Sequence, residues 1–171
     1  MATVRPGVML PKEVDSTLEC RIVEMRVKLK EEDAAVKVLE KISEKKERRN
    51  LSDSKIIVAG GRGVGSEEGM EHLRDLADAL GGEVAGTRVV VENGWLPAER
   101  QIGQTGQTVR PDLYVACGIS GAIQHRAGIL GSKHIIAINK DERAPIFEVA
   151  DLGIVGDVHA LVPALTKAVR L

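Results

Sequence analysis

Residues Gly118–His125 form an octet, Gly-Ile-Ser-Gly-Ala-Ile-Gln-His, that directly follows the apolar run Leu113–Cys117. A buried strand that ends in small residues and then opens a helix presents backbone N–H groups to phosphates in α/β proteins. The Ser120 hydroxyl and the Gln124 amide can hydrogen-bond ligand oxygens, and His125 can donate a hydrogen bond or hold a positive charge. The octet therefore predicts a phosphorylated cofactor site, although a histidine beside a helix start also serves structural hydrogen bonds.

A glycine-rich segment, Gly60–Gly65, follows the short apolar run Ile56–Ala59. It almost matches the dinucleotide-binding fingerprint, but Ser66 stands where the last glycine belongs, so the match is weak by itself. One interpretation is a tight turn that exposes Arg62. The other is a phosphate-binding turn, because a guanidinium group pairs well with pyrophosphate oxygens.

The stretch Gln101–Thr108 is polar, contains two glycines and carries no charge. It lacks the periodicity of a helix or a strand, so it is either a surface loop or an ordered loop that hydrogen-bonds a ligand. Thr87 and Arg88, which lie between two apolar stretches, are ambiguous by pattern alone.

Composition excludes several classes of function. The 171 residues carry a net charge of −1 and only 2% aromatic side chains, which argues against a basic nucleic-acid surface or a base-stacking platform. No apolar run approaches the roughly 20 residues of a membrane span. The histidines outside the octet have no partners at metal-ligand spacing, so no metal site is expected. The two cysteines suggest a reduced, intracellular chain, and Cys117, at the end of a buried strand, is expected to be inert.

The elements expected after residue 50 alternate between strands and helices. Ser66 is expected to cap a helix that stops at Gly81, a second helix is expected near Gly121, and Pro163 is expected in the first turn of the last helix. The predicted strands are 56–59, 83–86, 113–117, 134–139 and 153–156, and the last helix is 162–169. This order predicts a doubly wound parallel α/β sheet, with polar residues at the carboxyl ends of its strands where ligands bind.

Residues 1–50 differ from the rest of the chain. Cys20–Leu29 alternates like a half-buried strand, and 44–49 is a charged linker. The apolar residues of 36–42 fit either a strand or a helix, and we favour a strand. The segment has too few apolar residues for its own core. We therefore predict an extended N-terminal arm that ends another domain, with 51–171 as the cofactor-binding domain, and we expect the arm's apolar surface to favour self-association.

With these residues in hand, the chain resembles the α subunit of electron transfer flavoprotein. The likeness extends over residues 52–170 and rests on blocks in family order. These are Gly60–Gly63, Thr87–Arg88, Gln101–Gly106, Pro111–Tyr114, Gly118–His125, Ala137–Asp141, Ala144–Phe147 and Ala150–Asp151. The resemblance implies a three-layer, Rossmann-like FAD-binding domain, with most of the subunit's first domain missing.

The family's cofactor contacts, carried over residue by residue, imply a distributed FAD site. The resemblance places Arg62 near the phosphates, Arg88 against the flavin ring, the Thr105 hydroxyl near N5 and His125 near O2. It places residues 120–124 on the pyrophosphate and ribityl oxygens, and Asn139 and Asp157 at the adenosine end. The full implied set is Arg62, Thr87, Arg88, Ile102, Gly103, Gln104, Thr105, Ser120, Gly121, Ala122, Ile123, Gln124, His125, Asn139, Asp157 and Val158.

The resemblance also implies an electron carrier with no substrate turnover of its own. FAD would pass electrons from dehydrogenases to an acceptor such as a quinone reductase, through its oxidised, half-reduced and fully reduced states. The partner would be the β subunit, and the location would be the bacterial cytoplasm or the mitochondrial matrix. Thr87, Gln107 and Arg126 depart from the residues common in the family. An NAD- or nucleotide-binding enzyme domain on the same fold remains the alternative.

Overall fold

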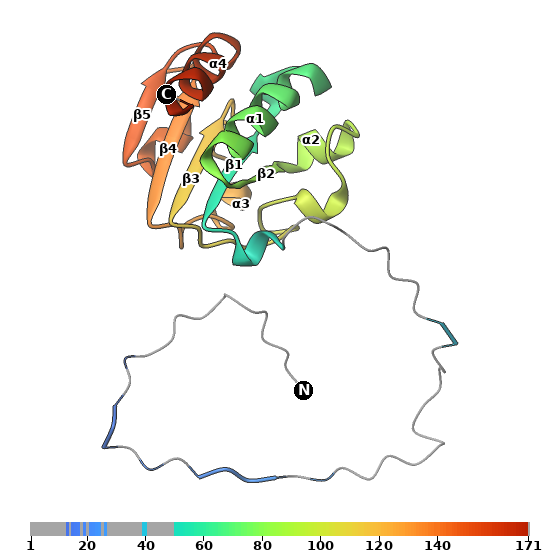
Figure 1. Cartoon of the computed structure of the whole chain (residues 1–171), viewed down its shortest axis with the longest axis vertical. Helices are drawn as coiled ribbons and strands as arrows, with labels where there is room; N and C mark the ends of the chain where they lie inside the picture. Colours follow the sequence, from blue (N-terminus) through green and yellow to red (C-terminus); the bar gives the residue numbers. More distant parts are fainter. Residues whose placement is uncertain are drawn as a thin grey trace. The chain divides into compact units, whose positions relative to one another are not determined.

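The computed structural model describes residues 50–170, together with scattered positions between 13 and 40, namely 13, 15–17, 19, 21–24, 26, 39 and 40. Residues 51–170 build an α/β domain on a parallel sheet of five strands in the order β2-β1-β3-β4-β5 (Figure 1). The strands are β1 Ile56–Gly60, β2 Glu83–Gly86, β3 Leu113–Cys117, β4 His134–Asn139 and β5 Leu152–Val155. The helices are α1 Glu67–Leu80, α2 Arg88–Glu92, α3 Ile123–Arg126 and α4 Val158–Val169, with short 3₁₀ turns at 51–53, 62–64, 98–100 and 145–148.

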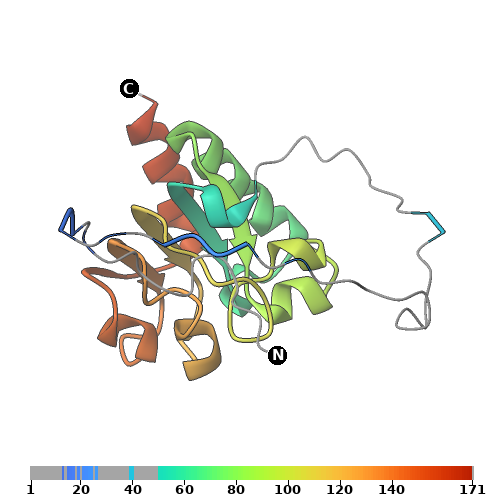
Figure 2. The same cartoon turned by 90° about the horizontal axis from the view of Figure 1, so that it is seen from below.

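The central strands are apolar on both faces, as expected for a parallel sheet that is covered on both sides. Val58, Val115 and Ile138 face the layer formed by α1 and α4, which lie side by side (Figure 1 and Figure 2). Tyr114 and Ile135 face the opposite way, toward a layer of short turns and loops. The predicted doubly wound α/β architecture is therefore confirmed.

Helix α1 begins and ends where its sequence signals predict. The Ser66 side chain accepts a hydrogen bond from the backbone N–H of Gly69 at 3.1 Å, and thereby caps the helix. Gly81 adopts the left-handed conformation, with φ of 67°, and stops the helix. Met70, Leu73 and other apolar side chains are fully buried against the sheet.

Helix α4 begins at Val158, four residues earlier than predicted, because the Asp157 side chain caps it there. The Asp157 carboxylate accepts a hydrogen bond from the backbone N–H of His159 at 2.9 Å. Pro163 consequently lies inside the helix rather than in its first turn. The β-branched run that follows Thr87 forms the short helix α2, a segment whose pattern was ambiguous. Strand β5 begins and ends one residue earlier than the predicted strand 153–156.

The strand predicted over Cys20–Leu29 is not formed at residues 21–24 or at Arg26. The side chains of Ile22 and Val23 are 84% and 66% exposed, so the described part of the segment lacks the packing that stabilises a strand. The rest of that prediction, and all of the strand predicted over 36–42 except its described positions 39 and 40, lies outside the described residues.

Candidate functional site

Two glycine loops meet at the carboxyl ends of the neighbouring strands β1 and β3. The Gly63 N–H donates to the Gly118 carbonyl, and the Gly61 N–H donates to the Cys117 carbonyl, both at 2.9 Å. A Cβ atom on Gly61 would lie 2.4 Å from the Gly118 oxygen, and one on Gly118 would lie 2.8 Å from the Gly63 Cα. The loops therefore touch through backbone alone, which only glycine permits. Because the chain leaves β1 toward β2 and later continues from β3 toward β4, this is the topological switch point where α/β sheets bind ligands.

Residues 119–124, between β3 and the first turn of α3, hold their backbone N–H groups available for a ligand. No acceptor among the described residues takes a hydrogen bond from these N–H groups. The carbonyls on the same segment are tied down, because the Asn139 amide donates to the Ile119 oxygen at 2.9 Å and the Ile146 N–H donates to the Ser120 oxygen at 3.0 Å. The segment thus presents donors on a fixed frame, which suits an anion.

The loop 101–107 is ordered and joins the strand edge to α3. The Ile102 N–H donates to the Gly86 carbonyl at 2.9 Å, and the Gln104 N–H donates to the Gln124 carbonyl at 2.7 Å. The Ile102 side chain is only 2% exposed, so this residue offers a ligand backbone atoms and no side-chain surface. Gln104 and Thr105 are exposed, and the Thr105 hydroxyl accepts a hydrogen bond from the Gln101 amide at 2.9 Å.

His125 is buried beneath this loop, with 7% of its surface exposed. Its Nδ1 atom lies 3.1 Å from the Ile102 carbonyl oxygen, and its Nε2 atom lies 3.0 Å from the Tyr114 hydroxyl. Burial lowers the pKa of His125 to about 4. Because a carbonyl only accepts, Nδ1 carries the proton, and Nε2 of the neutral ring accepts from Tyr114. Both ring nitrogens are thus engaged within the protein, and the contact with a flavin stays a prediction.

The remaining predicted residues lie along the same edge of the sheet. Arg62 follows β1 and is exposed, and Arg88, which follows β2, is exposed and pairs with Glu92 at 2.7 Å. Asp157 follows β5, where its carboxylate caps α4. Val158 is 5% exposed and packs in the core between the sheet and the helices, so its side chain has little surface for a ligand.

The donors, cations and glycine contact together fit a long ligand that carries phosphates. A side chain at Gly61 or Gly118 would fill the space where the two loops meet. The N–H groups of 119–124 match phosphate oxygens, and the exposed Ser120, Gln124 and Thr105 side chains match hydroxyl and ring-edge groups. The edge therefore has the donor set that a dinucleotide such as FAD requires.

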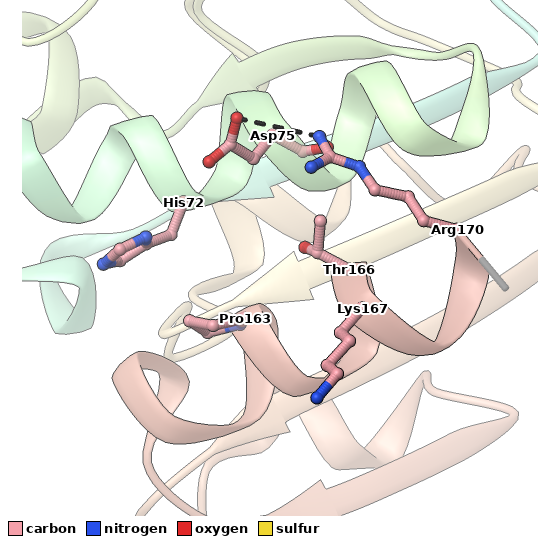
Figure 3. A pocket seen from close by; sticks show the side chains of 6 residues that line it. All are labelled: His72, Asp75, Pro163, Thr166, Lys167 and Arg170. Atoms are coloured by element: carbon pink, nitrogen blue, oxygen red, sulfur yellow. Dashed lines mark hydrogen bonds and ion pairs between the residues drawn. The ribbon is translucent and has the colours of Figure 1, made fainter.

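Two hollows elsewhere include none of these predicted residues. A groove of about 410 Å³ lies between α1 and α4 (Figure 3), and a hollow of about 560 Å³ lies at the amino ends of the strands. The groove is lined by His72, Asp75, Pro163, Thr166, Lys167 and Arg170. Figure 3 shows Arg170 turned toward Asp75, at 3.9 Å, across the groove. Neither hollow is lined by the glycine contact or by residues 119–124.

Sequence reasoning missed the residues that support the site from beneath. Tyr114 was predicted only as part of an apolar strand and of a family block, and Ile146 only as part of a family block, yet each bonds to a residue of the octet. Arg126, which departs from the family pattern, pairs with Glu148 at 2.6 Å and so links α3 to the turn at 145–148. These pairings join residues on separate elements, so the spacing of residues in the sequence does not predict them.

Residues 50–130 match the family model described as the electron transfer flavoprotein FAD-binding domain. A protein named Protein FixB, from Clostridium saccharobutylicum, is 57% identical over 165 residues, which cover 96% of this chain and 49% of the relative. The electron transfer flavoprotein subunit alpha of Clostridium acetobutylicum is 50% identical over 172 residues, covering 99% and 51%. The acryloyl-CoA reductase electron transfer subunit beta of Anaerotignum propionicum is 48% identical over 175 residues, covering 99% and 48%. The chain thus spans about half the length of these curated relatives.

Proposed function

Since the chain belongs to the electron transfer flavoprotein α family, matched through residues 50–130, we propose that it is an FAD-binding module that carries electrons between redox proteins. One observation supports this most strongly. The matched region contains the glycine contact between the β1 and β3 loops and the N–H groups of 119–124 that no described residue occupies. Bound FAD supplies reversible transfer of one or two electrons, which no side chain of the site provides.

We assign the phosphate end of the cofactor to the β1 and β3 loops. The N–H groups of 119–124 would hold the pyrophosphate oxygens, and the exposed Arg62 guanidinium would supply a balancing positive charge. Asn139 holds the β3 loop by its bond to Ile119, and with Asp157 it bounds the adenosine end.

We assign the flavin end to the loop 101–107 and the start of α3. Arg88 would supply a cation at this end, and Thr105 would offer a hydroxyl group to the flavin. A positive charge at this end stabilises the negative charge that reduction adds to a flavin, and so raises its reduction potential. The Gln104 N–H donates to the Gln124 carbonyl, so the loop 101–107 and the start of α3 are linked at this end.

An exposed apolar side chain beside the site supports a partner subunit. Ile123, within the octet, is 72% exposed, and Leu130, in the turn that follows α3, is 65% exposed. Large apolar side chains beside a cofactor site are typical of surfaces that another protein covers. We propose that the β subunit covers this surface, with dehydrogenases as donors and a separate redox protein as acceptor.

The helices bear on whether the chain could cross a membrane. None of the helices that the structure describes is both long and apolar enough to span a bilayer. A cytoplasmic location stays a prediction.

The absorption spectrum of the purified full chain tests this function. The chain is first mixed with excess FAD, and gel filtration then removes the free cofactor before the spectrum is recorded. We expect retained flavin bands, weakened in Arg62→Ala and unchanged in the control Arg170→Ala, which lies in the groove of Figure 3. Binding of NAD without flavin would instead support a nucleotide-dependent enzyme domain. Retention of neither cofactor would leave a subunit-contact module and would overturn the proposal.

A further inference from the structure

Tyr114 is the chain's only tyrosine, and its fully buried side chain is tied to the cofactor edge through a single polar contact. Its hydroxyl oxygen lies 3.0 Å from the Nε2 atom of His125. The two ring centroids are 6.2 Å apart with the planes tilted by 49°, so the contact is made by the hydroxyl group rather than by ring stacking.

The other ring nitrogen of His125 fixes the direction of this hydrogen bond. Nδ1 lies 3.1 Å from the Ile102 carbonyl oxygen, which can only accept, so Nδ1 is protonated. Burial raises the pKa of Tyr114 and lowers that of His125, so both groups are neutral near pH 7. The Tyr114 hydroxyl therefore donates to Nε2, and His125 is held as its Nδ1–H tautomer.

We propose that Tyr114 is a positioning residue of the FAD site, which holds His125 in one ring orientation and one tautomer and thereby fixes α3 and the loop 101–107 that form the flavin end. The inference rests on the proposed function. His125 connects three segments at this point, because it belongs to α3, contacts Tyr114 on β3 and contacts Ile102 in the loop 101–107. A change at Tyr114 is thus transmitted to the flavin end without Tyr114 touching a ligand.

A loss of the Tyr114 hydroxyl group would remove the hydrogen bond to His125 but would change the packing of the buried ring little. Tyr114→Phe keeps the buried ring but leaves Nε2 of His125 without its donor in an apolar setting. The Nε2 atom can then regain a hydrogen bond if the imidazole ring turns, if it changes its tautomer or if a ligand group becomes its new partner. A purely structural role for Tyr114 predicts a small loss of stability and none of these changes.

The test compares the full wild-type chain with Tyr114→Phe, using ¹⁵N NMR of the histidine rings without cofactor and flavin measurements with FAD. For the wild type we expect the neutral Nδ1–H tautomer at His125, assigned by its absence in His125→Gln. In Tyr114→Phe we expect a shifted Nε2 resonance, a changed flavin reduction potential and an FAD dissociation constant raised roughly three- to tenfold.

Each outcome bears on a separate claim. An Nε2–H tautomer in the wild type overturns the proposal, even if the Phe variant fails to fold. A shifted ring resonance with unchanged flavin potential and affinity also overturns it, because the bond would then matter only to the fold. Failure of the wild type to bind FAD, with the expected tautomer present, contradicts the proposed function and leaves the hydrogen-bond assignment intact.

Discussion

The side-chain amide of Asn139 donates a hydrogen bond to the carbonyl oxygen of Ile119 at 2.9 Å, which fastens the end of β4 to the loop that follows β3. The other atom of the amide, Oδ1, accepts from the Asp141 N–H at 3.0 Å. Asn139 therefore holds two loops of the cofactor edge at once.

Asn139→Ala should weaken FAD binding, because the Ile119–Gln124 segment loses its anchor. One or two hydrogen bonds of about 1 kcal/mol each correspond to a roughly five- to thirtyfold higher dissociation constant. Titration of the apoprotein with FAD measures the change. Asn93→Ala, at the exposed end of α2, is the control and should leave affinity unchanged. Equal affinities for both variants would contradict the anchoring role.

Gly121→Ala should destabilise the domain and abolish FAD retention. Gly121 has φ of 85°, and an added Cβ would lie 2.3 Å from the Ile146 nitrogen, whose N–H bonds to Ser120. Gly94→Ala is a matched control, since Gly94 has φ of 77° but nothing lies within 4 Å of the added atom. Both variants incur a backbone cost of about 1–2 kcal/mol, and Gly121→Ala should lose about 1–3 kcal/mol more from the clash. Urea unfolding measures this difference, and equal losses would exclude the steric argument.

Arg88→Ala should lower the reduction potential of bound flavin. The guanidinium group is exposed and its partner Glu92 remains, so the variant leaves a net negative charge at the flavin end. Arg88→Lys keeps the charge and should retain most of the potential. Spectroelectrochemical titration compares the variants with the wild type, and an unchanged potential in Arg88→Ala would remove Arg88 from the site.

The stability of the apoprotein should fall as the pH drops from 7 to 5, partly through His125. Its folded-state pKa of about 4 lies below the unfolded value of 6.5, so the unfolded chain binds more protons in this window. Linkage gives a loss of about 2 kcal/mol between pH 7 and pH 5 from this group. Urea unfolding of His125→Gln should show a correspondingly smaller pH dependence. Asn93→Ala, which removes no titrating group, is the control and should keep the pH dependence of the wild type.

Cys117 should resist thiol reagents while the domain is folded. The side chain is fully buried in the core beside α1, and burial raises the pKa of its thiol to about 12. In a Cys20→Ser background, a thiol reagent at pH 8 should label Cys117 only as denaturant unfolds the chain. Rapid labelling in buffer would show that β3 opens locally in the native state.

Sequence alone predicted the elements whose signals are local. The Ser66 cap, the Gly81 stop and the apolar run of β3 each depend on a few neighbouring residues. Pro163 was predicted in the first turn, but the Asp157 cap starts the helix earlier and leaves the proline inside it. An interior proline lacks one backbone hydrogen bond and crowds the carbonyl four residues earlier, so tertiary packing must offset that cost. The strand predicted from Cys20 is not formed at its described residues. An alternating apolar pattern favours a strand, but a stable strand also requires a neighbouring strand to pair with.

In the candidate site too, the features with local sequence signals were predicted and the long-range contacts were not. Its glycine and polar blocks were visible in the sequence and lie at one edge of the sheet, as predicted. The partners of His125 were not visible, because Tyr114 is eleven residues away and Ile102 lies on a different loop. Only the folded positions of β3, α3 and the loop 101–107 bring these atoms within hydrogen-bond distance.

The contact of Gly61 and Gly63 with Gly118 has a consequence for how the site can change. The two loops are joined by backbone hydrogen bonds, so no exposed side chain determines how far apart they lie. Substitutions at exposed positions such as Arg62, Ser120 and Gln124 can alter the charge and hydrogen bonding of the edge while its frame stays constant. The fold thus separates the dimensions of the site from its chemistry, which makes this edge a suitable scaffold for redesigned redox potentials.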